Sequence, residues 1–90
     1  MPRISKSSKA TEFKLFAPQA KKVYLSGSFN NWTNLAAKKD SKGNWSVKMN
    51  LKPGRYEYKF IVDGSWINDP KNSQLIWNGM GSQNSLIDIK

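Results

Sequence analysis

The sequence predicts an all-β fold in which antiparallel strands form a β-sandwich. Apolar and polar residues alternate over several short segments, which is typical of strands that bury one face. Turn-forming clusters separate these segments at intervals of about ten residues, as in sandwich folds. No window shows sustained helical periodicity. At 90 residues, the chain is long enough for one domain with one modest core.

The N-terminal half contains three expected strands. The first begins at Thr11 and ends before Pro18, and the second covers residues 23–25. An Asn-rich segment around Trp32 follows, and its composition suits a turn or loop. After a further turn cluster, residues 45–51 alternate strictly between apolar and polar side chains, which predicts a strand with one buried face.

The clearest strand covers residues 55–62. Its two faces are Tyr56, Tyr58, Phe60 and Val62 on one side, and Arg55, Glu57, Lys59 and Ile61 on the other. Asp63 and Gly64 form a strong hairpin signal after it, and residues 65–67 begin the return strand.

We expect a long polar loop at residues 71–83, with a last strand at residues 86–89. Loops of this length are uncommon in small domains and are often functional. The chain is therefore divided into a disordered basic tail at residues 1–10 and one folded domain at residues 11–90. The tail lacks the apolar stretch of a signal peptide, and no run is long enough to span a membrane, so we expect a cytoplasmic protein.

The composition excludes most catalytic chemistry. The chain has no Cys and no His, which removes thiol nucleophiles, disulfides, the commonest general base and the usual zinc ligands. The six carboxylates occupy turns or expected outer-face strand positions, and no spacing suggests a pair in a cleft. We therefore expect a protein that is not an enzyme and that has no metal or cofactor.

The net charge of +9 has two interpretations. A basic field attracts nucleic acid, but these basic residues are scattered and form no block of five like charges. A solubilising surface is the simpler interpretation.

Aromatic residues offer a more specific signal. Trp32, Trp66 and Trp77 all lie in loop-like contexts, whereas Trp45 belongs to an apolar strand face. The flat C–H face of a glucose ring packs well on an indole, while Asn and Lys side chains hydrogen-bond its hydroxyls. The same elements can stack nucleobases while Lys neutralises phosphates, and composition alone does not separate these interpretations.

Two segments resemble the glycogen-binding domains of carbohydrate-binding module family 48. They are residues 23–32 (VYLSGSFNNW) and residues 54–66 (GRYEYKFIVDGSW), the second followed by Asn68, Asp69 and Pro70. Such domains occur in the β-subunit of AMP-activated protein kinase and beside the catalytic domains of isoamylase and branching enzyme. The resemblance implies an immunoglobulin-like β-sandwich.

The resemblance also implies site residues. Trp32 and Trp66 match the two Trp that stack on glucose units, Lys59 matches a hydrogen-bonding Lys, and Asn84 matches an Asn just before the final strand. The remaining candidates come from the loop before that strand, which departs from the kinase-subunit pattern: Met80 and Ser82 stand nearest to a Leu and a Thr of that pattern, and Trp77 is a possible extra contact.

The leading hypothesis is a non-catalytic module that binds α-1,4-linked glucan, as glycogen, starch or maltooligosaccharide, and targets itself or a partner to it. The alternative is a regulatory protein-interaction domain in a glycogen- or starch-metabolising assembly, with an enzyme or kinase as partner. Binding of single-stranded nucleic acid is the third hypothesis. It predicts an affinity that falls steeply with salt, whereas an uncharged glucan would be nearly insensitive.

Overall fold

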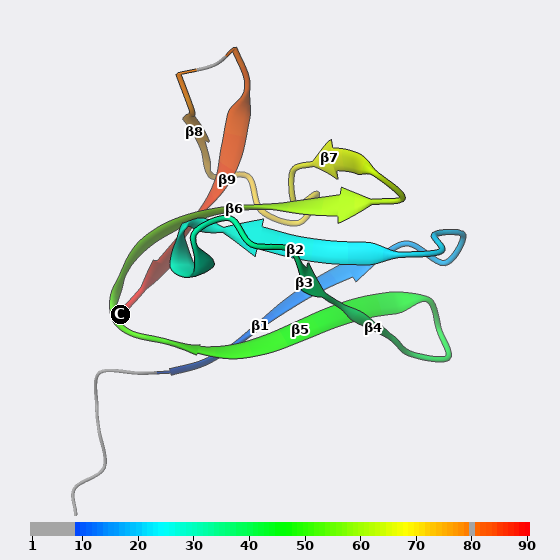
Figure 1. Ribbon diagram of the computed structural model, residues 1–90. Coiled ribbons are helices and arrows are strands. Elements are labelled where there is room, and N and C mark those ends of the chain that lie inside the picture. The colour runs from blue at the N-terminus through cyan, green and yellow to red at the C-terminus, as the bar shows by residue number, and fades with distance from the viewer. Residues whose placement is uncertain (1–8, 80) are drawn as a thin grey trace, which may run out of the picture.

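The computed structural model describes residues 9–79 and 81–90, in which two antiparallel sheets pack as a sandwich (Figure 1). The strands are β1 (Lys9–Phe16), β2 (Val23–Gly27), β3 (Leu35–Ala36), β4 (Lys38–Lys39), β5 (Asn44–Leu51), β6 (Gly54–Val62), β7 (Ser65–Ile67), β8 (Leu75–Trp77) and β9 (Gln83–Ile89). A single 3₁₀ turn, η1 (Ser28–Asn30), follows β2 in this part of the chain. The predicted all-β sandwich is confirmed. Within the same residues, no helix has the length and apolarity needed to cross a membrane.

The two sheets differ in width. The smaller sheet has the order β1-β5-β4, and the larger has the order β3-β2-β6-β9-β8, with β7 pairing with β6 as well. Strands β3 and β4 belong to different sheets although one residue separates them, so the chain crosses from one sheet to the other at Ala37.

Three strand predictions need correction. The expected loop at residues 71–83 contains β8, and the last strand, expected at residues 86–89, begins at Gln83, so that β8 and the start of β9 pair as a hairpin. Strand β8 consists of three consecutive apolar residues, Leu75, Ile76 and Trp77, between polar ones, so it lacks the alternation that would mark it as a strand. The first strand also starts earlier than Thr11, because Lys9 and Ala10 pair with β5. Residues 1–8 of the expected basic tail lie outside the described residues.

The core lies between the sheets and follows the predicted alternation. Its buried members are Phe13, Leu15, Val23, Leu25, Trp45, Val47, Leu51, Tyr58 and Phe60. Phe13 of the smaller sheet meets Tyr58 of the larger sheet edge-on, with ring centroids 4.9 Å apart, a favourable aromatic geometry. Ile61, predicted on the outer face, is also buried, because Tyr24 and Trp66 are its cross-strand neighbours on that face.

Strand β6 sets the geometry of the larger sheet. It pairs with β2 along one edge, and along the other edge with β9 as far as Tyr58 and with β7 from Phe60 onward. Lys59 therefore lies between the part of β6 that pairs with β9 and the part that pairs with β7. Its side chain points away from the core, because neighbouring residues of a strand face opposite ways.

Gly27, the last residue of β2, lies close to the backbone of β6 and to the Phe29 ring. A Cβ at this position would lie 2.6 Å from the Glu57 carbonyl oxygen and 2.6 Å from the Phe29 ring. We expect Gly27→Ala to lower the free energy of unfolding by about 1–3 kcal/mol, because backbone and ring must both shift. Thermal denaturation measures this, and a melting temperature that falls by less than about 1 °C would contradict it.

Candidate functional site

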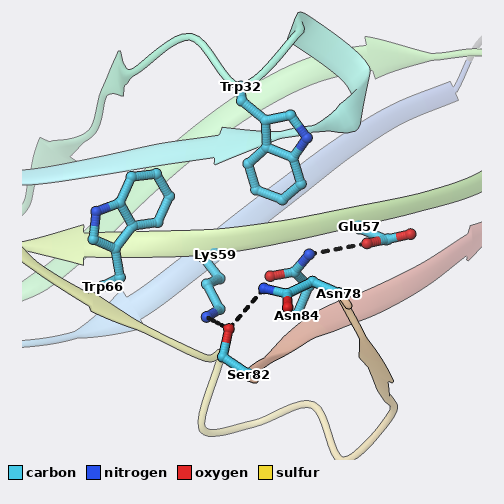
Figure 2. Close-up of a pocket in the computed structure, with 7 residues that line it drawn as sticks. All are labelled: Trp32, Glu57, Lys59, Trp66, Asn78, Ser82 and Asn84. Atoms are coloured by element: carbon cyan, nitrogen blue, oxygen red, sulfur yellow. Dashed lines mark hydrogen bonds between the residues drawn. The ribbon is translucent and has the colours of Figure 1, made fainter. Parts of the chain in front are cut away.

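A shallow cavity of about 570 Å³ opens on the outer face of the larger sheet. Its lining residues are Trp32, Glu57, Lys59, Trp66, Asn78, Ser82 and Asn84 (Figure 2). Five of these were predicted from the sequence, and four different segments bring them together: the loop after η1, β6, β7 and the β8–β9 hairpin.

Trp32 is held by an unusual backbone turn. After η1, Asn31 and Trp32 both adopt left-handed conformations, with φ of 56° and 58°. The Asn30 amide fixes the turn, accepting from the Gly27 N–H at 3.3 Å and donating to the Thr33 carbonyl at 2.8 Å. A bulky residue in the left-handed region costs about 1–2 kcal/mol, and such strain concentrates at functional sites. This backbone conformation places the Trp32 indole at the cavity (Figure 2).

Trp66 enters from the hairpin that joins β6 to β7. Asp63 and Gly64 both have positive φ, as the predicted two-residue turn requires. The Asp63 carboxylate accepts from the backbone N–H groups of Lys21 and Lys22, at 2.9 and 2.8 Å, which ties the hairpin to the loop before β2. The Trp66 side chain is 52% exposed and is therefore available to a ligand.

Lys59 and the hairpin tip form the polar rim. The Lys59 ammonium donates to Ser82 Oγ at 3.5 Å, and the Asn78 amide donates to the same hydroxyl at 2.6 Å. The Asn78 backbone N–H also donates to the Ser82 carbonyl at 3.0 Å. Asn78 and Ser82 are thus hydrogen-bonded to each other across the hairpin, and Lys59 links Ser82 to β6 beside the cavity.

Asn84 and Glu57 form a second polar pair. Asn84 is 5% exposed, and its Nδ2 donates to Glu57 Oε1 at 2.9 Å. Because the amide nitrogen is engaged, the oxygen of Asn84 is the atom best placed to accept a hydrogen bond from a ligand. One cation, Lys59, and one anion, Glu57, line the cavity, so it is close to neutral and suits an uncharged ligand with hydroxyl groups.

Tyr58 anchors the hairpin from the core side of β6. Its hydroxyl donates to Asp69 Oδ2 at 2.7 Å and accepts from the Asn72 amide at 3.0 Å, while Asn72 also donates to the Leu86 carbonyl at 2.8 Å. The Ser85 hydroxyl accepts from the Asp69 N–H at 2.9 Å. Burial, opposed in part by the Asn72 hydrogen bond and assisted by Asp69, raises the pKa of the Tyr58 phenol.

Two sequence candidates remain, Trp77 and Met80. Trp77 is not among the cavity residues: it pairs with Gln83, one position from Asn84, and therefore faces the opposite side of the hairpin. Met80 lies outside the described residues. The sequence analysis missed Glu57 and Asn78 as lining residues. The alternation with Lys59 could have revealed Glu57, whereas Asn78 had no periodic signal.

Two half-exposed indoles around a shallow, nearly neutral cavity on a β-sandwich form a candidate binding site for an uncharged ligand. Over residues 10–90 the sequence matches the family described as the glycogen recognition site of AMP-activated protein kinase, and the chain belongs to this family. The resemblance seen in the sequence is thereby confirmed, and family membership supports α-glucan binding in general.

Individual relatives agree with this membership. The chain is 41% identical over 70 residues to 5'-AMP-activated protein kinase subunit beta-1 of Rattus norvegicus, covering 78% of this chain and 25% of that protein. It is 39% identical over 80 residues to protein FLOURY ENDOSPERM 6, chloroplastic, of Oryza sativa subsp. japonica, covering 88% of this chain and 15% of that protein. The chain thus spans a quarter or less of the length of these two relatives.

Among solved structures, the enterobactin esterase FES of Shigella flexneri superimposes with a TM-score of 0.79 at 16% identity, covering 98% of this chain and 31% of that chain. This similarity shows the fold alone.

The Tyr58 anchor leads to a stability prediction. Tyr58→Phe should lower the free energy of unfolding by about 1–3 kcal/mol, because Asp69 and Asn72 lose a shared partner. Tyr56→Phe is the matched control, since the Tyr56 hydroxyl donates only to the exposed Lys52 carbonyl at 2.8 Å, and its effect should be smaller.

The same variant has a pH signature. Because the pKa of Tyr58 is higher in the folded than in the unfolded chain, the protonated phenol stabilises the folded state. This stabilisation is complete at pH values below the ordinary pKa of 10.0 and is lost as the pH rises above 10.0. The difference in stability between the wild type and Tyr58→Phe should therefore narrow above about pH 10 in urea titrations. A difference that stays constant or widens would contradict the assignment.

Proposed function

We propose that this chain is a non-catalytic module that binds α-1,4-linked glucan by stacking glucose rings on Trp32 and Trp66. The observation that carries the proposal is the convergence of the Trp32 and Trp66 indoles on one cavity with Lys59 and Asn84 (Figure 2). Each indole offers a flat apolar surface to the C–H face of a sugar ring. The Lys59 ammonium donates to sugar hydroxyls, and the Asn84 amide oxygen accepts from them.

The cavity chemistry favours binding over catalysis. Glycoside hydrolysis generally needs two carboxylates on either side of the scissile bond. Among the described residues that line the cavity, Glu57 is the only carboxylate, and its Oε1 is occupied by the Asn84 amide. These groups supply recognition and no paired acid and base.

Membership of this family supports a role for the module in a larger assembly. We propose that it brings an attached or associated protein, such as a glycogen-metabolising enzyme or a kinase, to the surface of a glucan particle. A regulatory protein-interaction role is the alternative, and the kinase-subunit relative favours it as a second function. A cytoplasmic location stays a prediction, because one relative is named as chloroplastic.

The stacking proposal predicts a large effect of Trp66→Ala. Titration calorimetry with maltoheptaose should show an affinity at least about tenfold weaker, because a sugar ring loses its apolar surface. Phe16→Ala is the matched control: Phe16 is an aromatic residue, 59% exposed, on the smaller sheet, and its removal should leave binding unchanged.

The same titration separates glucan from nucleic acid. Between about 50 and 200 mM salt the maltoheptaose affinity should stay nearly constant, whereas phosphate-driven binding falls steeply. Absence of binding by folded wild-type protein would overturn the glucan proposal. Tight, salt-sensitive binding of a single-stranded oligonucleotide at the same time would favour the nucleic-acid hypothesis.

Glu57 is predicted to act through Asn84. Glu57→Ala removes the acceptor of the Asn84 amide, so the amide can rotate, and maltoheptaose affinity should fall by about two- to tenfold. Glu57→Gln retains an acceptor oxygen and should restore most of the affinity. If Glu57→Gln binds as weakly as Glu57→Ala while both remain folded, the carboxylate itself contacts the sugar and the positioning role is wrong.

A further inference from the structure

The β8–β9 hairpin has an unusual composition. Residues 72–87 contain no charged side chain, although 23% of the whole chain is charged. Asn, Gln and Ser make up most of the polar positions in this segment. Figure 1 shows the hairpin projecting away from the body of the sandwich. It therefore presents two uncharged faces, of which the cavity uses one.

The pairing register assigns side chains to these faces. Ile76 pairs with Asn84, which places both on the cavity side. Trp77 pairs with Gln83, and these two lie on the opposite side, because successive residues of a strand alternate. Leu75 shares this side with Trp77, two residues away. We call Leu75, Trp77 and Gln83 the reverse platform.

The reverse platform is uncovered. Trp77 is 66% exposed and Leu75 is 41% exposed, so the smaller sheet does not bury this end of the larger one. Trp77 also takes no part in the buried core. An indole left in water forgoes the stabilisation that burial of its apolar surface provides, so its presence here needs another explanation.

We propose that the reverse platform is a second, shallow binding surface for glucan, on which a glucose ring stacks on Trp77 while Gln83 hydrogen-bonds its hydroxyls. This inference rests on the proposed function, because it assigns the same ligand class to a second surface. Trp77 and Gln83 are direct cross-strand neighbours, and the Cβ atoms of such pairs are about 4.5–5.5 Å apart. The Gln83 amide is therefore within reach of a sugar ring stacked on the Trp77 indole.

The chemistry of the platform favours a neutral sugar over other occupants. A nucleic acid needs cations to neutralise its phosphates, and residues 72–87 supply none. A second copy of the chain would need about 800 Å² of buried surface on each side for a stable dimer, whereas one aromatic residue buries about 150–250 Å². An indole with a neighbouring amide is enough for one or two sugar rings.

The two surfaces lie on opposite sides of one hairpin, which determines how they act together. A short oligosaccharide in the cavity does not reach the reverse platform. Two chains of a branched polymer can occupy both surfaces at once, and the second binding event is then effectively intramolecular. The hairpin thus binds branched glucan bivalently, through the cavity on one side and the reverse platform on the other.

Nuclear magnetic resonance provides the test on the intact chain. Each of the four Trp gives one indole N–H signal, and each Trp→Ala variant assigns its own signal. On titration with maltoheptaose, the Trp66 and Trp77 signals should both shift, with different dissociation constants. In Trp66→Ala the Trp77 signal should still shift. In Trp77→Ala the affinity of the cavity should change by less than about twofold, because distant sites are nearly independent.

Several outcomes would overturn the inference. If maltoheptaose shifts the Trp66 signal but not the Trp77 signal, the reverse platform does not bind glucan, and the proposed function of the cavity is unaffected. A Trp77 signal that shifts only when Trp66 is present makes it part of the first site. A signal that moves with protein concentration instead identifies a second copy of the chain as the occupant. If neither signal responds, both proposals are wrong.

Glycogen supplies the readout for bivalency. In affinity electrophoresis, Trp77→Ala should weaken the apparent affinity for glycogen by at least about tenfold, far more than it changes the affinity for maltoheptaose. Phe16→Ala again serves as the control for loss of an exposed aromatic residue. Equal effects of Trp77→Ala on the two ligands would overturn bivalent binding.

Discussion

The pleat of β6 is the constraint on which the rest of the structure depends. This strand is paired on both edges, and its alternation divides its side chains between two functions. Tyr58 and Phe60 point inward and join the core, whereas Glu57 and Lys59 point outward and line the cavity. A shift of one residue in the register of β6 would exchange these sets, so the core that stabilises the fold also fixes the orientation of the site.

The site is made rigid by contacts beneath and beside it. The Tyr58 hydroxyl, the Asp69 carboxylate and the Asn72 amide tie the hairpin to the core. The strained turn at Trp32 is held by Asn30, whose amide accepts from the Gly27 N–H and donates to the Thr33 carbonyl. A shallow site makes few contacts with its ligand, and ordering it on binding would use much of the available free energy. A preorganised platform avoids this cost.

Among the described residues, Lys59 is the only cation that lines the cavity, and several other Lys lie on the smaller sheet. Lys14 and Lys38 both pair with Ser46 on the outer face of the smaller sheet, and Lys48 follows two residues along the same strand. The cavity, on the larger sheet, contains one cation and one anion. This separation explains how a chain with a net charge of +9 can present a nearly neutral surface to an uncharged polymer. It also agrees with the interpretation of the charge as a solubilising property of the remaining surface.

The alternation and the turns in the sequence were enough to predict the sandwich and the inner and outer faces of β6, and the motif resemblance supplied candidate site residues. Strict alternation and turn chemistry are local signals, and the motif resemblance indicated Trp32, Lys59, Trp66 and Asn84 as candidates, which the structure places around one cavity. Only the tertiary structure decided that Glu57 orients Asn84, that Asn78 joins the rim and that Trp77 faces the reverse side. These facts depend on the register between β8 and β9. Three consecutive apolar residues in β8 and three polar residues at the start of β9 show no alternation, so the sequence does not mark which side of the hairpin faces the cavity.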